Sequence, residues 1–152
     1  MTEYLTFQAG SETWALPLRS IREIIQPPPI TRIPFTSPAL PGVINLRGQL
    51  LPVLDLAAHL ERNTENSNKN CLLIVERRDE QFGPEGMGLR VDSVSVVLEL
   101  TAEEVNAVPA FGSEVRADFL SGILRLDTAL IPVLNLETLL AQSELSHYIH
   151  GA

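Results

Sequence analysis

Three histidines and one cysteine are the side chains of this chain best suited to bind a metal ion or to act as nucleophiles. They are His59, Cys71, His147 and His150. His147 and His150 are three residues apart near the C-terminus, but with Cys71 and His59 they form no zinc-ligand pattern. A Gly-x-Ser-x-Gly elbow, which would expose a nucleophilic serine, is also absent from the sequence. We therefore predict no metal site and no catalytic residue.

A glycine-containing stretch, GPEGMG at residues 83–88, is the only candidate for a phosphate-binding loop. Its spacing fits neither the dinucleotide-binding fingerprint nor a Walker loop, in which backbone N–H groups surround the phosphates. Because it follows a polar, acidic stretch, we interpret it as part of a hairpin turn. No nucleotide or other cofactor is predicted.

One cation stands out because of its surroundings. Arg47 lies in LPGVINLRGQLLPVLDL, residues 40–56, a segment that is otherwise strongly apolar. A charge that is buried without a partner costs several kcal/mol. The sequence therefore predicts that Arg47 is paired with a carboxylate.

The segment around Arg47 occurs twice in the chain. Residues 40–60 and 120–140 align with an offset of 80, and nine of the 21 positions are identical. Upstream, residues 15–25 resemble residues 88–98 with an offset of 73. Arg47 aligns with Asp127, so the two copies are not interchangeable, whereas Gly42 aligns with Gly122, which indicates a backbone role shared by both copies. The chain is interpreted as a diverged tandem duplication.

Short strands and turns are expected to position these residues. Residues 4–8 and 13–18 predict one hairpin, and residues 71–76 and 87–100 predict another. Asp55 and Asn135 are good N-caps for two helical tails. The asparagine-rich stretch 61–70 separates approximate lobes 1–65 and 71–140 of a single domain, 1–152, with a C-terminal helical tail at 135–148. Strands could be exchanged between the lobes, and closure of each sheet into a small barrel would remove its edges.

Composition excludes several classes of protein. The 152 residues are 45% hydrophobic, and their formal net charge is −8, which opposes nucleic-acid binding. A single cysteine fits a reducing compartment. Neither a signal peptide nor an apolar run long enough to cross a membrane is present, so we expect a cytoplasmic protein without direct membrane insertion.

The motif GVINLRG followed by LPVLDL resembles the CheW family of chemotaxis coupling proteins. The resemblance extends to YLTFQAGSETWALPLRSIREII near the N-terminus and to GLRVDSVSVVLEL in the second half. It implies a mainly β fold of two pseudo-symmetric five-stranded SH3-like barrels with short helices. It also implies a non-catalytic adaptor that connects methyl-accepting chemoreceptor tips to the regulatory domain of a CheA-type histidine kinase.

The same resemblance suggests the partner of Arg47 and a set of partner-binding residues. Glu23 occupies the position expected to face Arg47, and the pair would fix the SIREI segment against the NLRG turn. The expected partner-binding residues are Ile21, Glu23, Gly42, Val43 and Arg47. The branched residues Ile24 and Ile44 flank the same proposed groove. An ion pair that serves only the internal structure is the alternative for Glu23 and Arg47.

Three functions remain open from the sequence. The first is the chemotaxis adaptor, associated with membrane-anchored receptor arrays and monomeric or weakly self-associating. The second is an adaptor of a non-flagellar pathway, such as type IV pili, surface sensing or development. The third is a ligand-binding or enzymatic barrel, which would require a concave polar pocket with perturbed titratable groups.

Overall fold

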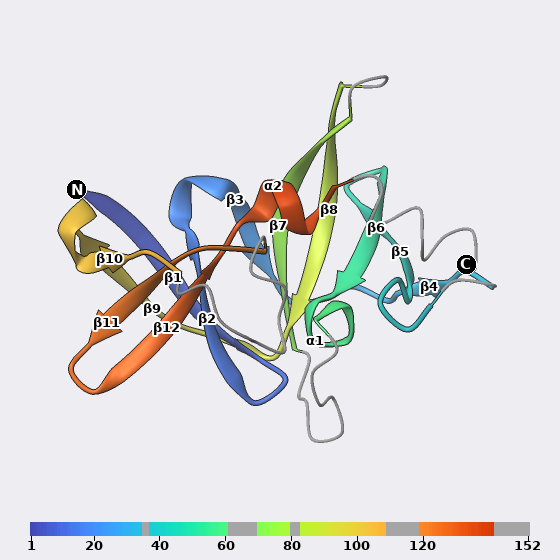
Figure 1. Cartoon of the computed structure of the whole chain (residues 1–152). Helices are drawn as coiled ribbons and strands as arrows, with labels where there is room; N and C mark the ends of the chain where they lie inside the picture. The colour runs from blue at the N-terminus through green and yellow to red at the C-terminus, as the bar shows by residue number, and fades with distance from the viewer. Residues whose placement is uncertain (35–36, 61–69, 80–82, 109–118, 142–152) are drawn as a thin grey trace.

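The computed structural model describes residues 1–34, 37–60, 70–79, 83–108 and 119–141. Two six-stranded sheets contain nearly all of its regular structure (Figure 1). We name each sheet by its terminal long strand. The β3 sheet has the order β3 (Ile21–Ile25), β7 (Cys71–Asp79), β8 (Gly83–Val91), β6 (Gln49–Asp55), β5 (Gly42–Leu46) and β4 (Thr31–Arg32).

The β9 sheet repeats this order strand for strand. It consists of β9 (Ser93–Leu100), β1 (Thr2–Ala9), β2 (Glu12–Pro17), β12 (Ala129–Leu134), β11 (Leu120–Leu126) and β10 (Val105–Asn106). Each sheet thus has five longer strands and one strand of two residues. Each also has one parallel pair at the same place, β6 with β8 and β12 with β2.

The two sheets do not divide the chain at one point. β1 and β2 pair within the sheet that also holds β11 and β12, while β3 to β8 form the other sheet. The hairpin formed by β1 and β2 therefore belongs with strands more than 100 residues later in the chain. This arrangement is the strand exchange that the sequence analysis left open.

Each sheet encloses its own small apolar core, and a larger core lies between the sheets. Ile44, Leu51, Val53, Leu72 and Ile74 form the core of the β3 sheet, and Ala15, Leu100, Leu124, Ile131 and Val133 form that of the β9 sheet. The central core includes Phe7, Trp14, Leu54, Leu73 and Met87, from strands of both sheets. Because apolar burial dominates folding, this shared core makes the sheets one cooperative unit.

The helices are shorter than the sequence suggested. α1 (Leu56–His59) and α2 (Leu136–Leu139) are single turns. The Asp55 side chain accepts a hydrogen bond from the Ala58 N–H, and the Asn135 side chain accepts one from the Thr138 N–H, so both predicted N-caps are confirmed. The remainder of the predicted tail, from residue 142, lies outside the described residues, as do residues 61–69 of the predicted loop.

Two 3-10 turns are present: η1 (Leu18–Ser20) precedes β3, and η2 (Ala102–Glu104) follows β9. η2 begins with a capping box formed by Thr101 and Glu104. The turn predicted at 83–88 is wrong, because β8 begins at Gly83. A Cβ atom at Gly86 would lie 3.1 Å from Leu51 Cδ2, and one at Gly88 would lie 3.3 Å from Leu72 Cδ2. These two glycines allow close packing inside the β3 sheet.

Candidate functional site

Arg47 lies in the turn between β5 and β6, at the surface of the β3 sheet. Leu46 and Gln49 pair across this two-residue turn, in which Arg47 has φ 51° and Gly48 has φ 87°. Positive φ at both central residues is typical of the type I′ turn, which suits the twist of a hairpin. The Gly48 N–H donates to Asn45 Oδ1 at 2.9 Å. The prediction that Arg47 is a charge within a buried apolar segment is therefore wrong, because the turn places Arg47 at the surface.

Arg47 forms a two-pronged ion pair with Glu23 of β3. Its Nη1 donates to Glu23 Oε2 at 3.4 Å, and its Nη2 donates to Glu23 Oε1. The side chain of Arg47 is 70% exposed and that of Glu23 is 33% exposed. Within the sheet order, three strands lie between β3 and β5. The pair therefore ties the terminal strand to a hairpin across the curled sheet, and we name these two residues the corner pair.

The corner pair changes the titration of its carboxylate. The hydrogen bond from Arg47 lowers the pKa of Glu23 below the ordinary value of 4.5, against a smaller opposing effect of desolvation. The same hydrogen bond raises the pKa of Arg47. Because both groups are in contact with water, the pair contributes orientation more than stability.

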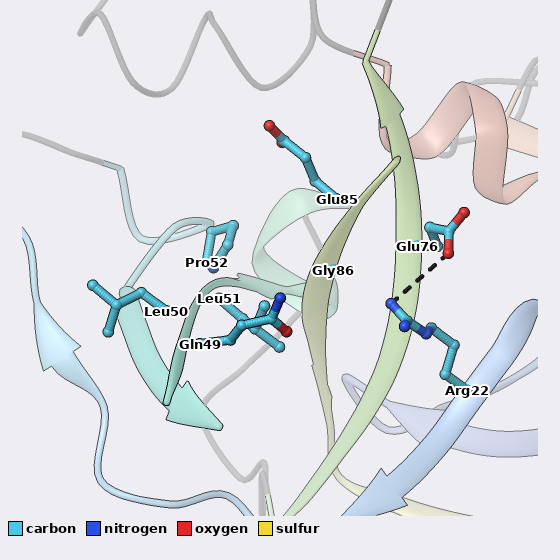
Figure 2. A pocket seen from close by; sticks show the side chains of 8 residues that line it. All are labelled: Arg22, Gln49, Leu50, Leu51, Pro52, Glu76, Glu85 and Gly86. Atoms are coloured by element: carbon cyan, nitrogen blue, oxygen red, sulfur yellow. Dashed lines mark ion pairs between the residues drawn. The ribbon is translucent and has the colours of Figure 1, made fainter. Parts of the chain in front are cut away.

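A hollow of about 470 Å³ opens on the β3 sheet. It is lined by Arg22, Gln49, Leu50, Leu51, Pro52, Glu76, Glu85 and Gly86 (Figure 2). Arg22 Nη1 lies 3.8 Å from Glu76 Oε2, a long and exposed ion pair. In Figure 2 the Leu50 side chain points away from the other lining residues, and it is 72% exposed. The hollow is a shallow, mixed surface beside an exposed leucine.

The other predicted partner-binding residues are placed differently from one another. Ile21 is half-buried and packs against the central core, and Val43 is half-buried on β5. Gly42 is buried, and a Cβ atom there would lie 2.0 Å from the carbonyl oxygen of Thr31. The close approach of β4 therefore requires a glycine at position 42. None of these three residues lines the hollow.

The flanking isoleucines differ in burial. Ile44 is 1% exposed and belongs to the core of the β3 sheet, whereas Ile24 is 42% exposed. Side chains alternate between the two sides of a strand, so neighbouring residues differ in burial. On β3 a bulge lies between Ile21 and Glu23. Ile24 is therefore the exposed apolar residue next to the corner pair.

A second arginine pair, which the sequence analysis missed, lies in the interior. Arg90 donates from Nε at 2.9 Å and from Nη2 at 2.7 Å to Asp55 Oδ2. The Asp55 side chain is 2% exposed and that of Arg90 is 18% exposed. The repeat contained a signal for this pair, because Asp55 aligns with the neutral Asn135 while Arg90 aligns with Pro17. The two charges are present together in one copy and absent together from the other.

The histidines form no metal centre among the described residues. No three His, Cys, Asp or Glu side chains gather there in a way that could hold an ion. His59 is buried, stacks on Phe119 with ring centroids 5.4 Å apart, and has Nε2 at 3.1 Å from the Leu139 carbonyl oxygen. Burial raises the pKa of the Cys71 thiol, so the reactive thiolate is disfavoured. His147 and His150 lie outside the described residues.

Among the described residues, no helix combines the length and the apolar character that crossing a membrane requires.

Comparisons of the sequence and of the fold with known proteins both match CheW proteins. The CheW-like domain model matches residues 3–144. The probable chemotaxis protein CheW of Rhizobium etli is 34% identical over 93% of this chain and 89% of its own length. The chemotaxis protein CheW of Klebsiella aerogenes is 31% identical over 95% of this chain and 84% of its own length.

A solved structure has the same architecture. The scaffolding protein TtCheW from Thermoanaerobacter tengcongensis superposes with a TM-score of 0.80 at 27% identity, covering 91% of this chain and 86% of that chain. The predicted fold class, mainly β with two pseudo-symmetric SH3-like barrels of five main strands and short helices, is confirmed. With a family match over nearly its whole length and relatives above 30% identity, the chain belongs to the CheW-like family.

Proposed function

We propose that this protein is a non-catalytic adaptor that couples the cytoplasmic tips of methyl-accepting chemoreceptors to the regulatory domain of a CheA-type histidine kinase. The observation that carries the proposal is the match to the CheW-like domain over residues 3–144. The fold resemblance to a protein described as a scaffold supports it. Under this proposal the protein acts at the cytoplasmic face of receptor arrays, uses no cofactor and does not insert into the membrane.

The proposed partner-binding surface is the corner of the β3 sheet, with Ile21, Glu23, Gly42, Val43 and Arg47. Two nitrogens of the Arg47 guanidinium engage Glu23, and the group is 70% exposed. A guanidinium has five N–H donors, so it retains donors for the backbone carbonyls or carboxylates of a partner. Glu23 holds the fork in a fixed direction, which gives geometric specificity.

One sequence match supports the alternative function, that of an adaptor in a non-flagellar pathway. Protein PilI of Pseudomonas aeruginosa is 30% identical over 88 residues, covering 58% of this chain and 47% of its own length. This match motivates the hypothesis of an adaptor in a non-flagellar pathway. The longer coverage of the CheW relatives from Rhizobium etli and Klebsiella aerogenes makes chemotaxis the first proposal.

A titration with the two proposed partners tests the function. The purified protein is titrated calorimetrically with a receptor-tip hairpin peptide and, separately, with the kinase regulatory domain. We expect saturable binding to each in the micromolar range, because modular contacts of signalling arrays are individually weak. An absence of binding to both partners would contradict the adaptor proposal.

The corner pair is tested by a charge exchange. Glu23→Arg alone and Arg47→Glu alone place like charges together and should weaken binding to the receptor tip. The double variant restores an ion pair of reversed direction and should recover part of the loss if the role is to hold the two strands together. Asp127→Ala, in the equivalent turn of the other sheet, is the matched control and should bind like the unaltered protein. Equal affinities for all four variants would show that the corner pair serves only the internal structure.

A further inference from the structure

The hairpin of β1 and β2 lies in the middle of the β9 sheet, not at its edge. β1 pairs with β9 on one side, and β2 pairs in parallel with β12 on the other. Without the hairpin, β9 would be separated from the group of β12, β11 and β10. Completion of the β9 sheet therefore depends on a segment that is distant in the sequence from the strands it joins.

The hairpin also contributes large side chains to the interior. Phe7, Trp14 and Leu16 are at most 1% exposed and belong to the central core, and Ala15 belongs to the core of the β9 sheet. Because apolar burial dominates folding, the hairpin is stable only when it is packed into a β9 sheet. None of these contacts requires that the sheet and the hairpin come from the same copy of the chain.

The connection from the hairpin to the β3 sheet is a short turn with few contacts. η1 (Leu18–Ser20) joins β2 of one sheet to β3 of the other. The Ile21 N–H donates to the Leu18 carbonyl oxygen, and no side chain caps the turn. None of its three residues is buried, although Leu18 packs at the margin of the central core. Opening η1 therefore disturbs little of the interior.

The turn at η1 keeps the hairpin on its own copy. In Figure 1 the chain changes direction there, between β2 and β3. Three residues in an extended conformation span about 10 Å, so opening of the turn would carry the hairpin away from its own β9 sheet. Short connections of this kind favour the exchange of an element between two copies.

We propose that two copies of this protein exchange their β1–β2 hairpins and form a domain-swapped dimer, with η1 as the hinge. Each hairpin then makes the same contacts with β9 and β12, but in the β9 sheet of the second copy. The two forms differ mainly in the conformation of η1 and in the entropy of association, so high protein concentration favours the dimer. The inference concerns the protein without receptor or kinase, and its test is separate from that of the proposed function.

A pair of opposed residues can report which copy each hairpin occupies. Glu3 on β1 and Glu99 on β9 face each other across antiparallel strands, and both are exposed. Cα atoms of directly opposed residues are about 4.5–5.5 Å apart, which suits a disulfide. In the variant Glu3→Cys with Glu99→Cys, made in a Cys71→Ala background, a monomer forms this disulfide within one chain. A swapped dimer forms it between two chains.

Refolding at different concentrations tests the proposal. The variant is unfolded under reducing conditions, refolded at low and at high concentration, separated by size-exclusion chromatography and then oxidised. We expect a dimer fraction that grows with the concentration during refolding. On a denaturing gel without reductant, that fraction should run as covalent dimers, and the monomer fraction should run as single chains with an internal disulfide.

A change in the length of the hinge gives a second measurement. Three residues, Gly-Ser-Gly, inserted after Arg19 lengthen the hinge and should lower the dimer fraction several-fold, because a longer loop lets the hairpin fold back more easily. The same insertion after Gly10, in the turn of the hairpin itself, is the matched control and should leave the dimer fraction unchanged. Circular dichroism verifies that both insertion variants fold.

Three results would overturn the proposal. The first is a protein that stays monomeric after refolding at its highest soluble concentration. The second is a dimer whose disulfides all lie within single chains, because such a dimer associates through its surface and keeps its hairpins. The third is a dimer fraction that is insensitive to the insertion after Arg19, which would exclude η1 as the hinge.

Discussion

The β3 sheet and the β9 sheet have the same skeleton and different surfaces. Their strands follow the same order, including the parallel pair and the two-residue strand at one end. The terminal strands β3 and β9 are equivalent at the offset of 73, which aligns Glu23 with Val96. The corner pair of one sheet is therefore replaced by an exposed valine and by Asp127 in the other.

Backbone roles are shared by the two sheets even where side chains differ. A Cβ atom at Gly42 or at Gly122 would collide with the neighbouring short strand. The bulge on β3 also has a counterpart, between Leu5 and Phe7 where β1 pairs with β9. There the Thr6 hydroxyl donates to the Val96 carbonyl oxygen at 3.0 Å and accepts from the Val96 N–H at 3.1 Å. Gly42 and Gly122, which allow a close approach of the short strands, are the same in both sheets, whereas the positions of the corner pair diverged to Val96 and Asp127.

The exposed terminal strands of the two sheets differ in chemistry. On β9, the residues Val94, Val96 and Val97 are all exposed, whereas β3 has Ile21 half-buried, Glu23 paired and Ile24 exposed. One edge is thus apolar and the other combines charge with a single exposed isoleucine. Surfaces with such different chemistry suit different partners.

The largest expected effect concerns the interior pair that only one sheet has. Asp55→Asn keeps an N-cap, as Asn135 does in the other copy, but leaves the largely buried Arg90, whose side chain is 18% exposed, without a carboxylate. We expect the free energy of unfolding to fall by about 3 kcal/mol, because removing one partner of a buried pair leaves an uncompensated charge. Urea denaturation measures this change. Asn135→Asp is the control and should change stability far less; similar losses in both variants would contradict a special interior pair.

A smaller effect is expected from the two equivalent glycines. Gly42→Ala places a Cβ atom 2.0 Å from a backbone oxygen, while Gly122→Ala places one 2.7 Å from the movable Val105 Cγ1. Overpacking costs roughly 1–3 kcal/mol, and the rigid contact should lie at the upper end. Thermal unfolding of the two variants compares them. A more damaging Gly122→Ala would show that β10 is held more rigidly than β4.

A substitution at His59 would make one more position identical in the two repeat copies. His59 aligns with Leu139, whose carbonyl oxygen lies 3.1 Å from the histidine Nε2. His59→Leu makes the two positions identical, removes that hydrogen bond and adds apolar volume. We expect a change in stability of about 1 kcal/mol. Denaturant unfolding measures the change, and His59→Gln is a control that keeps a hydrogen-bond donor. A loss of unfolding free energy larger than that of Asp55→Asn would contradict this expectation, because it would make His59 the more important polar residue.

The smallest effect concerns the pH dependence of the corner pair. Since the folded-state pKa of Glu23 is lowered, its stabilising contribution is present above the unfolded-state value and is lost as the pH falls through the folded-state value, below 4.5. An NMR titration of the Glu23 carboxyl should show this lowered pKa, and Arg47→Ala should raise it. Asp127→Ala should leave the titration unchanged. An unshifted Glu23 in the unaltered protein would mean that the pair does not persist in solution.

Local sequence signals predicted part of the skeleton of this fold. The repeat of residues 40–60 at 120–140 corresponds to two equivalent hairpins, and Asp55 and Asn135 marked the helix starts. The stretch 87–100, predicted as one strand, is divided between β8 and β9, which lie in different sheets. The exchange of β1 and β2 into the sheet with β11 and β12 was not determined by periodicity, because a strand's pattern shows which side is buried and not which strand it pairs with. Within the described residues each helical tail begins with a single turn, Leu56–His59 and Leu136–Leu139.

The candidate site was predictable only in part. The partner suggested for Arg47 came from family resemblance, and the contact with Glu23 depends on how far the sheet curls. The surface position of Arg47 followed from the turn, which the neighbouring Gly48 indicates in the sequence. Arg90 was missed because it lies in a strand pattern like any exposed residue, and its pairing with Asp55 joins parallel strands 35 residues apart.

The central claim is that a shared skeleton carries a receptor-binding corner on one sheet only. Reciprocal substitution tests it, because Arg47→Asp and Asp127→Arg exchange the residues of two equivalent turns. Calorimetric affinity for a receptor-tip hairpin is the measurement. We expect at least about a tenfold loss of affinity for Arg47→Asp, because a charged hydrogen-bonding group is lost, and no loss for Asp127→Arg. Equal losses in the two variants, or a loss confined to Asp127→Arg, would contradict it.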